Sequence, residues 1–148
     1  MSRTRYYSER CFICGRSNHK GLHADIISDG ASVVITAAPA TQFQGFDGVV
    51  HGGIISALLD ETLWYAVYVA GHVTVTVQLQ LTIRRAASPG EALRASAKFT
   101  GRDRRYLLAE GTVHNAAGEL LAEAKGRFLP APHLEAHLGE LIISESLD

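Results

Sequence analysis

The sequence predicts one α+β domain in which an antiparallel β-sheet covers a single long helix. The segment 53–69 carries apolar side chains on nearly every helical face, and a helix of this kind is buried. Four later segments alternate apolar and polar residues with the two-residue period of a strand. The chain has 148 residues, about the length of one domain. Because such a sheet has one face that needs cover, the only long helix must supply it.

The part of the chain before the helix predicts a hairpin followed by an irregular loop. Residues 22–37 contain two short apolar runs on either side of a turn-forming cluster at 28–30. Residues 41–53 are rich in glycine, which suits a loop whose backbone approaches another group closely. The helix that follows starts with good helix formers and is expected to end before Gly71.

Four strands are predicted after the helix, and together they form an antiparallel meander. In residues 73–84, Val, Leu or Ile occupies every odd position and Thr, Gln or Arg every even one, so the apolar side chains are expected on one face. The other strands are expected at 92–100, 105–114 and 120–129. Turn residues at 88–90, 101–103 and 115–118 connect neighbouring strands within hairpin length.

Two flanking segments are expected around the core domain, which we place at 22–130. Residues 1–21 form an N-terminal leader, and residues 131–148 form an acidic tail. From Pro130 on the chain has no Lys or Arg, so we expect the tail to be peripheral, with room for a short helix.

Composition excludes several classes of protein. With 47% hydrophobic and 20% charged residues, the chain can build a core and is not of the disordered class. Its net charge of −1 argues against binding nucleic acid or an anionic membrane through overall charge. The two cysteines are too close together to form the disulfide framework of a small secreted protein. No segment has the pattern of a signal peptide or of a membrane-spanning helix. These observations predict a cytoplasmic protein.

One motif and one acidic pair carry the chemistry. His51, Gly52 and Gly53 stand where the glycine-rich loop meets the helix. The start of a helix presents unpaired N–H groups and a partial positive charge, so this junction can bind a ligand oxygen. Asp60 and Glu61 are the next ionisable side chains along the helix. A carboxylate on an apolar helix is costly unless it has partners or a chemical task.

These residues resemble a known family. The segment FQGFDGVVHGGIISALLDE, residues 43–61, resembles the acyl-CoA thioesterases of the hotdog fold, particularly the phenylacetate-pathway (PaaI-like) branch. In that family a His-Gly-Gly motif opens the central helix, and an acidic residue nine positions after the histidine does the chemistry. The resemblance extends to about Leu129. It implies a hotdog fold, in which an antiparallel sheet wraps around one long central helix.

The resemblance implies a catalytic role for five residues. Asp60 would act as general base on water or as nucleophile through a mixed anhydride, and the Gly52 N–H would hold the developing oxyanion. Thr76 matches a small hydroxyl near the acid. Gln44 resembles a loop amide that assists the same step, one residue further from His51 than in related enzymes. From the residues alone, His51 also suits a capping role at the loop-to-helix junction.

Basic residues suggest where the phosphates of coenzyme A would bind. Arginines and one lysine are concentrated between positions 84 and 105, and arginine forks match phosphate oxygens well. A solvated strand face is the alternative for any single arginine. The residues we expect to bind substrate are Gly53, Glu61, Arg84, Arg102, Arg104 and Arg105. For Glu61, which points about 100° away from Asp60 around the helix, an ion pair or an interface role is the alternative.

The leader contains a second motif. Cys11, Cys14, His19 and His23 have the spacing C-x2-C-x4-H-x3-H, which is close to a zinc knuckle but differs from it in the last ligand. Related thioesterases carry a similar C-x-x-C-G leader in which the residues after the cysteines form a turn and a strand start. We therefore assign no metal and no cofactor to the predicted site.

The predicted function is hydrolysis of an acyl-CoA with an aryl or medium-chain acyl group, next to Phe43, Phe46, Trp64 and Tyr68. A single sheet leaves an edge strand open, so we expect at least a homodimer with the site at the subunit interface, and either tetramer of the fold is compatible with it. The alternatives are a non-catalytic acyl-CoA-binding protein, a hotdog dehydratase or hydratase, and a zinc-knuckle nucleic-acid-binding module.

Overall fold

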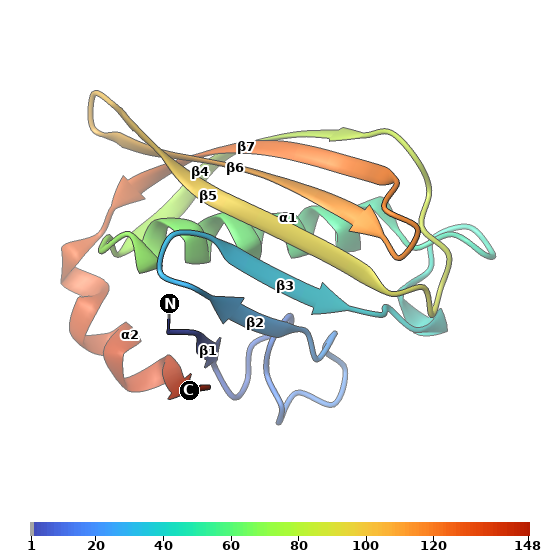
Figure 1. Cartoon of the computed structure of the whole chain (residues 1–148), viewed down its shortest axis with the longest axis horizontal. Helices are drawn as coiled ribbons and strands as arrows, with labels where there is room; N and C mark the ends of the chain where they lie inside the picture. The colour runs from blue at the N-terminus through green and yellow to red at the C-terminus, as the bar shows by residue number, and fades with distance from the viewer. Residues whose placement is uncertain (1) are drawn as a thin grey trace.

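The computed structural model describes residues 2–148, whose strands form one eight-stranded sheet (Figure 1). The strands are β1 (Thr4–Tyr7), β2 (Asp25–Ser28), β3 (Val33–Ala37), β4 (Thr74–Ile83), β5 (Leu93–Asp103), β6 (Tyr106–Asn115), β7 (Leu120–Pro130) and β8 (Ile143–Ser146). The helices are α1 (Gly52–Val69) and α2 (Glu135–Leu141), with 3-10 turns η1 (Thr41–Phe43) and η2 (Pro132–Leu134). Neighbouring strands are antiparallel in the order β4-β7-β6-β5-β3-β2-β1-β8. The expected four-strand meander is therefore wrong at its first connection: the turn at 88–90 does not join neighbours, because β4 pairs with β7 and β5 pairs with β3 and β6. Within residues 2–148, neither helix has the length and apolar character needed to cross a bilayer.

The predicted buried helix is confirmed. α1 packs against β3, β4, β5, β6 and β7, which curve around it. Leu58, Leu59 and Leu63 are completely buried, and each contributes roughly 1.5–3 kcal/mol by leaving water. The helix therefore forms the centre of the core, which explains why its sequence lacks a fully polar face.

Two glycines in the sheet let α1 approach it closely. A Cβ atom added at Gly111 on β6 would lie 2.7 Å from Leu63 Cδ1, and one at Gly126 on β7 would lie 3.0 Å from Leu63 Cδ2. Real Cβ atoms do not tolerate contacts this short without rearrangement of their neighbours. The Leu63 side chain thus occupies the space that larger residues on these two strands would fill.

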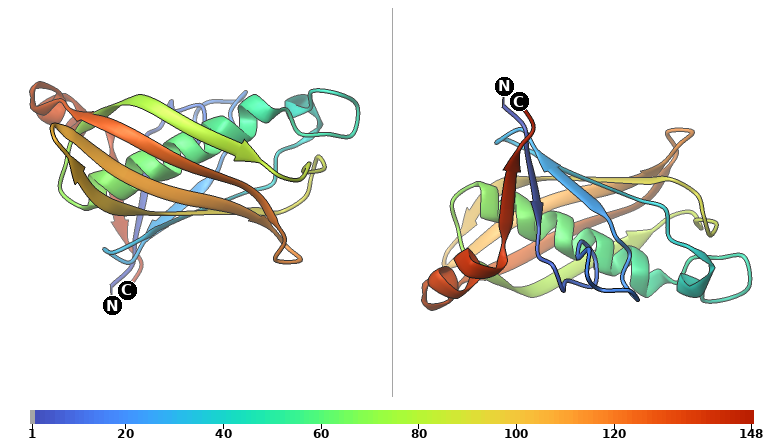
Figure 2. Two further views of the ribbon diagram at one scale, coloured as in Figure 1. Left: turned by 90° about the horizontal axis from the view of Figure 1, so that it is seen from above. Right: turned by 90° about the horizontal axis from the view of Figure 1, so that it is seen from below.

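The two ends of the chain meet in the sheet. β1 lies between β2 and β8, so the N-terminal and C-terminal strands pair with each other (Figure 1). Figure 2 shows these strands crossing the side of α1 that faces away from β4 to β7. Tyr6 on β1 packs against Tyr65 and Tyr68 of α1, with ring centroids 5.8 and 6.1 Å apart. The leader and the acidic tail therefore contribute cover to the helix.

The uninterrupted alternation expected for the strand after the helix is wrong at one point. The pairing of β4 with β7 shifts register between Thr76 and Gln78, so Val77 is the extra residue of a β-bulge. Before the bulge Thr74 is buried and Val75 is exposed, whereas after it Leu79 turns toward the core. The bulge thus lets threonines and leucines of one strand face the same helix.

The turn expected at 101–103 is also wrong. These residues belong to β5, and the chain reverses instead around Arg104, whose φ is +57°. The pairing of β5 with β6 shifts between Phe99 and Gly101, and Gly101 has φ +134°. The glycine that suggests a turn in the sequence is therefore part of a bulge inside the strand.

Candidate active site

Asp60 lies on α1 at the half-buried side that faces β4. Its Oδ1 accepts a 2.8 Å hydrogen bond from the Thr76 hydroxyl. Thr76 reaches the helix because it precedes the bulge, where the threonines of β4 point inward. No hydrogen bond to the other oxygen, Oδ2, is formed within residues 2–148. The hydroxyl therefore orients the carboxylate while one of its oxygens stays available to a substrate or a water molecule.

An aromatic wall continues from Asp60 along the same side of α1. Trp64 and Tyr68 follow it at intervals of four residues, so they lie on one helical face. Their rings stack with centroids 5.2 Å apart, and Trp64 Nε1 donates a 2.8 Å hydrogen bond to the Thr74 carbonyl. Both aromatic side chains are only half-buried. An apolar surface therefore adjoins the carboxylate.

The start of α1 leaves one backbone N–H of the His-Gly-Gly motif without a hydrogen-bond acceptor within residues 2–148. His51 is the N-cap residue, and its Nδ1 accepts a 2.8 Å hydrogen bond from the Gly53 N–H. The Gly52 N–H donates no hydrogen bond within residues 2–148. Since the N–H of Gly53 is used by the histidine, the unpaired donor of the motif is Gly52.

A cavity of about 660 Å³ opens at this end of the helix. Its lining includes Phe46, His51, Gly52, Ile83 and Arg84. Phe46 is 87% exposed, so the loop presents an aromatic ring at the cavity. Asp60 does not line it. Within one chain, the predicted oxyanion donor, Gly52, lines this cavity, whereas the predicted acid, Asp60, lies outside it.

The family of the chain follows from a comparison with family models. The model of the thioesterase superfamily matches residues 47–122, just over half of the chain. The chain belongs to the thioesterase superfamily. This segment contains the His-Gly-Gly motif, α1 and most of the following meander. A search of curated proteins gave no match.

Solved structures share the hotdog fold of this thioesterase-superfamily chain. The thioesterase superfamily protein RHA08564 is 28% identical with a TM-score of 0.76, and the match covers 82% of this chain and 60% of that protein's length. The E. coli PaaI protein of the phenylacetic acid degradation operon is 21% identical with a TM-score of 0.68, and the match covers 74% and 80% of the two chains. The predicted resemblance to PaaI-like proteins is confirmed by these findings.

A third related structure contains coenzyme A. It is a hypothetical thioesterase protein from Streptococcus pneumoniae TIGR4, 20% identical with a TM-score of 0.65, and the match covers 69% of this chain and 80% of that one. Two alanine variants of this protein have also been solved, one at an aspartate and one at a threonine. The two substituted positions are sixteen residues apart.

Gln44 stabilises the loop before α1. Its Oε1 accepts a 3.1 Å hydrogen bond from the Gly48 N–H, and its backbone forms an isolated bridge with Val50. In this arrangement the amide closes the loop and does not contact Asp60. The side chain therefore supports the loop that carries His51.

The arginines expected to bind substrate do not form one patch in a single chain. Arg84 pairs with Glu123 at 2.8 Å, close to the cavity at the start of α1. Arg102, Arg104 and Arg105 belong to the β5–β6 hairpin tip, at the opposite end of the sheet (Figure 1). The ten residues of β6 separate the two ends, a distance of roughly 30 Å. Only Arg84 adjoins the predicted oxyanion donor.

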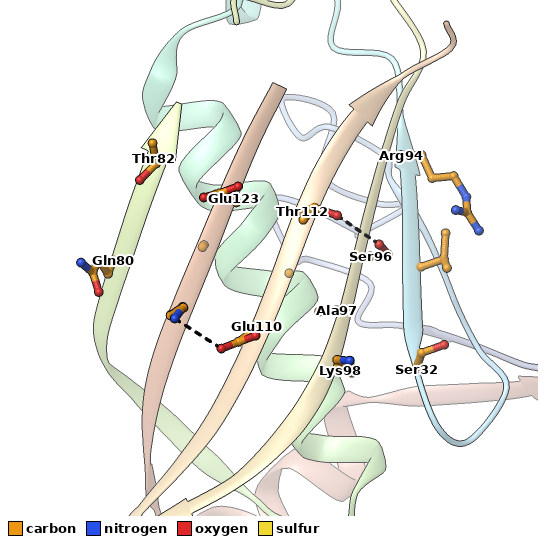
Figure 3. A pocket seen from close by; sticks show the side chains of 14 residues that line it. Ser32, Gln80, Thr82, Arg94, Ser96, Ala97, Lys98, Glu110, Thr112 and Glu123 are labelled. Atoms are coloured by element: carbon orange, nitrogen blue, oxygen red, sulfur yellow. Dashed lines mark hydrogen bonds and ion pairs between the residues drawn. The ribbon is translucent and has the colours of Figure 1, made fainter. Parts of the chain in front are cut away.

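A second hollow of about 730 Å³ lies on the face of the sheet that points away from α1 (Figure 3). Its lining is polar and carries charges of both signs. The Lys125 and Glu110 side chains form an ion pair at 3.6 Å, and the hydroxyls of Ser96 and Thr112 lie 3.5 Å apart. Asp60 and the His-Gly-Gly motif are on the other side of the sheet, so this hollow is separate from the candidate active site.

Glu61 lies on the other side of the helix from Asp60 and contacts the leader. Its Oε1 and Cys11 Sγ are joined by a 3.0 Å hydrogen bond. Burial, reinforced by Cys11, raises the pKa of Glu61 to about 9. A hydrogen bond from Cys14 lowers the pKa of Cys11 to about 5. Glu61 and Cys11 therefore share one proton near neutral pH.

The sequence motif in the leader assembles with a different partner from the one its spacing suggests. Within residues 2–148, the group of close metal-ligating atoms consists of Cys11, Cys14 and Glu61. His19 and His23 are exposed and do not belong to it. The zinc-knuckle pattern missed Glu61, because that residue is 50 positions away from Cys11 in the chain. The signal in the sequence is a carboxylate on an otherwise apolar helix, which needs a partner when it is buried.

Proposed function

We propose that this protein hydrolyses an acyl-CoA thioester with an aryl or medium-chain acyl group, giving the free acid and coenzyme A. One observation carries the proposal. The Asp60 carboxylate accepts a 2.8 Å hydrogen bond from Thr76 on the half-buried side of α1, while the Gly52 N–H at the helix start stays unpaired. Membership of the thioesterase superfamily and the coenzyme A in the S. pneumoniae structure support the substrate class.

Gly52 would stabilise the charge that develops during the reaction. Its N–H donates to the thioester carbonyl oxygen, which becomes an oxyanion when the carbonyl carbon is attacked. The partial positive charge of the helix start acts in the same direction. One well-placed donor of this kind contributes roughly 3–4 kcal/mol to the transition state.

Asp60 would supply the attacking group by one of two routes. As a general base it removes a proton from water, the water oxygen attacks the carbonyl carbon, and the coenzyme A thiolate leaves and takes up a proton. As a nucleophile it forms a mixed anhydride and expels the thiolate, and water then hydrolyses the anhydride. The Thr76 hydroxyl orients the carboxylate in both routes. The substituted aspartate and threonine of the S. pneumoniae protein have the same separation as Asp60 and Thr76, sixteen residues.

A complete site requires two chains. Gly52 and Asp60 are eight residues apart on one helix, which is a rise of about 12 Å. A thioester carbon must lie within about 3–3.5 Å of the attacking oxygen, with its carbonyl oxygen at hydrogen-bond distance from the N–H. One chain cannot satisfy both distances. We therefore assign Asp60 of one protomer and Gly52 of its partner to the same site.

The edge strand β4 is the surface that would join the two chains. It is the first strand of the sheet order, so one side of its backbone is unpaired. Val75 and Val77 on this strand are 41% and 48% exposed. An apolar, unpaired edge strand is a template for pairing with another chain. Pairing of two β4 strands would bring the second protomer next to the half-buried side of α1.

The acyl group would lie against the aromatic wall beside Asp60. Trp64 and Tyr68 present stacked rings there, which suits a flat aryl group or a medium-length chain. Phe43 is buried against Phe12 and packs in the core. Phe46 lines the cavity at the start of α1, which under the two-chain arrangement belongs to the partner's half of the site.

The first experiment measures thiol release from a panel of acyl-CoA esters with the wild type and with Asp60→Asn. The amide keeps the size of the side chain but can neither accept the water proton nor attack. We expect a loss in kcat of roughly 100- to 10,000-fold. An unchanged rate in the variant would contradict the mechanism. Binding of these esters without any turnover would instead favour the acyl-CoA-binding protein.

The second experiment removes the Gly52 N–H without disturbing the helix. Gly52 is the first residue of α1, where proline is well tolerated. The preceding residue, His51, has φ −59° and ψ 136°, which a following proline favours. Gly52→Pro should therefore fold and lose roughly 100-fold or more in kcat. Gly52→Ala, which adds a side chain but keeps the N–H, is the matched control and should retain most of the activity.

The third experiment tests the two-chain site by mixing inactive variants. Asp60→Asn and Gly52→Pro are unfolded together and refolded, so that mixed dimers form. A mixed dimer holds one site with both defects and one intact site, so thiol release should return. If both groups act within one chain, every site keeps one defect and the mixture stays inactive.

A further inference from the structure

The leader and α1 bring three ligating side chains together next to Asp60. Cys11 Sγ, Cys14 Sγ and a carboxylate oxygen of Glu61 all lie within 4.8 Å of one another. In a tetrahedral zinc site with sulfur and oxygen ligands, neighbouring ligand atoms are about 3.3–3.8 Å apart, as the bond lengths require. Small side-chain rotations are enough to close the three atoms around one ion.

The backbone holds the two cysteines in place. The Gly15 N–H donates to the Cys11 carbonyl at 2.8 Å, and the Ile13 N–H donates to Cys11 Sγ at 3.4 Å. A Cβ atom at Gly15 would lie 2.5 Å from the carbonyl oxygens of Cys11 and Glu9, so the turn accepts only glycine there. Amide N–H groups directed at sulfur favour the thiolate, which is the form that binds a metal.

Glu61 has an oxygen that the protein leaves unpaired. Its Oε2 is buried and has no hydrogen-bond partner within residues 2–148. A buried carboxylate oxygen without a partner is costly. The side chain is held by a rigid helix, and its other oxygen already contacts Cys11. A cation at this point would bind the unpaired oxygen.

We propose that Cys11, Cys14 and Glu61 bind one zinc-class divalent cation. Two sulfur ligands select zinc-like ions over magnesium or calcium, and a carboxylate oxygen is an ordinary third ligand. Cys11 is only half-buried, so a water molecule can take the fourth position. Binding releases two protons, the one that Glu61 and Cys11 share and the one on the Cys14 thiol, and the ion's charge of +2 offsets most of the charge of the two thiolates and the carboxylate. The site is independent of the thioester hydrolysis proposed above.

This site would attach the leader to the central helix. Cys11 of the leader contacts α1 at Glu61, and the preceding helix residue, Asp60, faces β4. An ion bound by both segments would hold α1 in one orientation relative to the leader. Because Glu61 is next to Asp60, this would also help to fix the direction of the Asp60 carboxylate. The role is structural, and the ion takes no part in the hydrolysis.

The test uses reduced, chelator-treated full-length protein titrated with cobalt(II), which replaces zinc and absorbs light when bound to thiolates. We expect one cobalt per chain with sulfur-to-cobalt charge-transfer bands, and the bands should disappear when zinc is added. Cys11→Ser and Glu61→Gln should each weaken binding by roughly 100-fold or more, because each removes a direct ligand, and the loss of a partner outside the ligand set already costs about 10- to 100-fold. His19→Ala and His23→Ala are the controls and should bind as the wild type does.

Several outcomes would overturn the proposal. Reduced wild type that shows no charge-transfer band does not use the cysteines as ligands. Equal loss of binding in a histidine variant would identify the zinc knuckle instead. Unchanged metal binding in Glu61→Gln would show that the Glu61 carboxylate is not a ligand. Circular dichroism shows whether each variant is folded, and the cysteine chosen for substitution is Cys11 because it is the more exposed of the two.

Discussion

Asp60 and Glu61 are consecutive residues whose carboxylates point from α1 to different neighbours, β4 and the leader. Asp60 accepts a hydrogen bond from Thr76 on β4 at 2.8 Å, and Glu61 is hydrogen-bonded to Cys11 in the leader at 3.0 Å. Successive residues of a helix point about 100° apart. One turn of helix therefore presents an acid to the half-open side, where we propose the chemistry, and an acid to the side that the leader covers.

Two threonines on β4 should respond differently to the same substitution. Thr76→Val removes the hydrogen bond to Asp60, so we expect a loss in kcat of roughly 10- to 100-fold, the value of a hydrogen bond to a charged group. The hydroxyl of Thr74 is buried and has no partner within residues 2–148. Thr74→Val should therefore leave kcat unchanged and keep or raise the free energy of unfolding. Thiol release and urea unfolding of both variants check this, and equal losses of kcat would contradict it.

The close approach of α1 to the sheet makes two glycines sensitive to a methyl group. Gly111→Ala would bring a Cβ within 2.7 Å of both Leu63 and the Ser96 carbonyl oxygen. Because the backbone oxygen cannot rotate away, we expect a loss of about 1–3 kcal/mol in the free energy of unfolding. Gly139→Ala on α2 is the control, since nothing lies within 4 Å of its added Cβ. Denaturant titration measures both, and an equally stable Gly111→Ala would show that the sheet can shift.

The edge of the sheet should control the oligomeric state. Val75→Lys places a charge on the exposed apolar edge of β4, and we expect dimer dissociation to become roughly 100-fold easier, as for a desolvated charge at an interface. Gln80→Lys adds the same charge to the outer face of the same strand, away from the exposed valines and among the polar residues of the second hollow. Size-exclusion chromatography with light scattering compares the two. If Val75→Lys elutes as the wild type does, β4 is not the interface.

The cap of α1 should contribute to stability. His51→Ala removes the acceptor of the Gly53 N–H, which should lower the free energy of unfolding by about 0.5–2 kcal/mol. His51→Asn keeps a capping side chain and should lose less. Thermal and denaturant unfolding of the two variants give the comparison. An equal loss in the two variants would mean that packing of the ring, against Gly45 and Gly53, matters more than the cap.

Local patterns were enough to predict most of the fold. The buried helix was expected at 53–69 and forms at Gly52–Val69, because its apolar residues leave no solvated face. Alternation located the strands of the meander, since a half-buried strand must alternate. Patterns failed where an extra residue interrupts a strand. The bulges at Val77 and near Gly101 depend on pairing with a neighbour, so a single strand carries no sign of them.

The sequence by itself determined the central helix, the four strands that follow it and the His-Gly-Gly motif with Asp60 nine positions later, because these depend on residues close together in the chain. Only the tertiary structure decided that Thr76 faces Asp60, that β1 pairs with β8, and that Glu61 joins the cysteines of the leader. Those contacts connect residues 16 to more than 130 positions apart. They form because the closing sheet must cover every side of an apolar helix, and that requirement is set by packing in three dimensions.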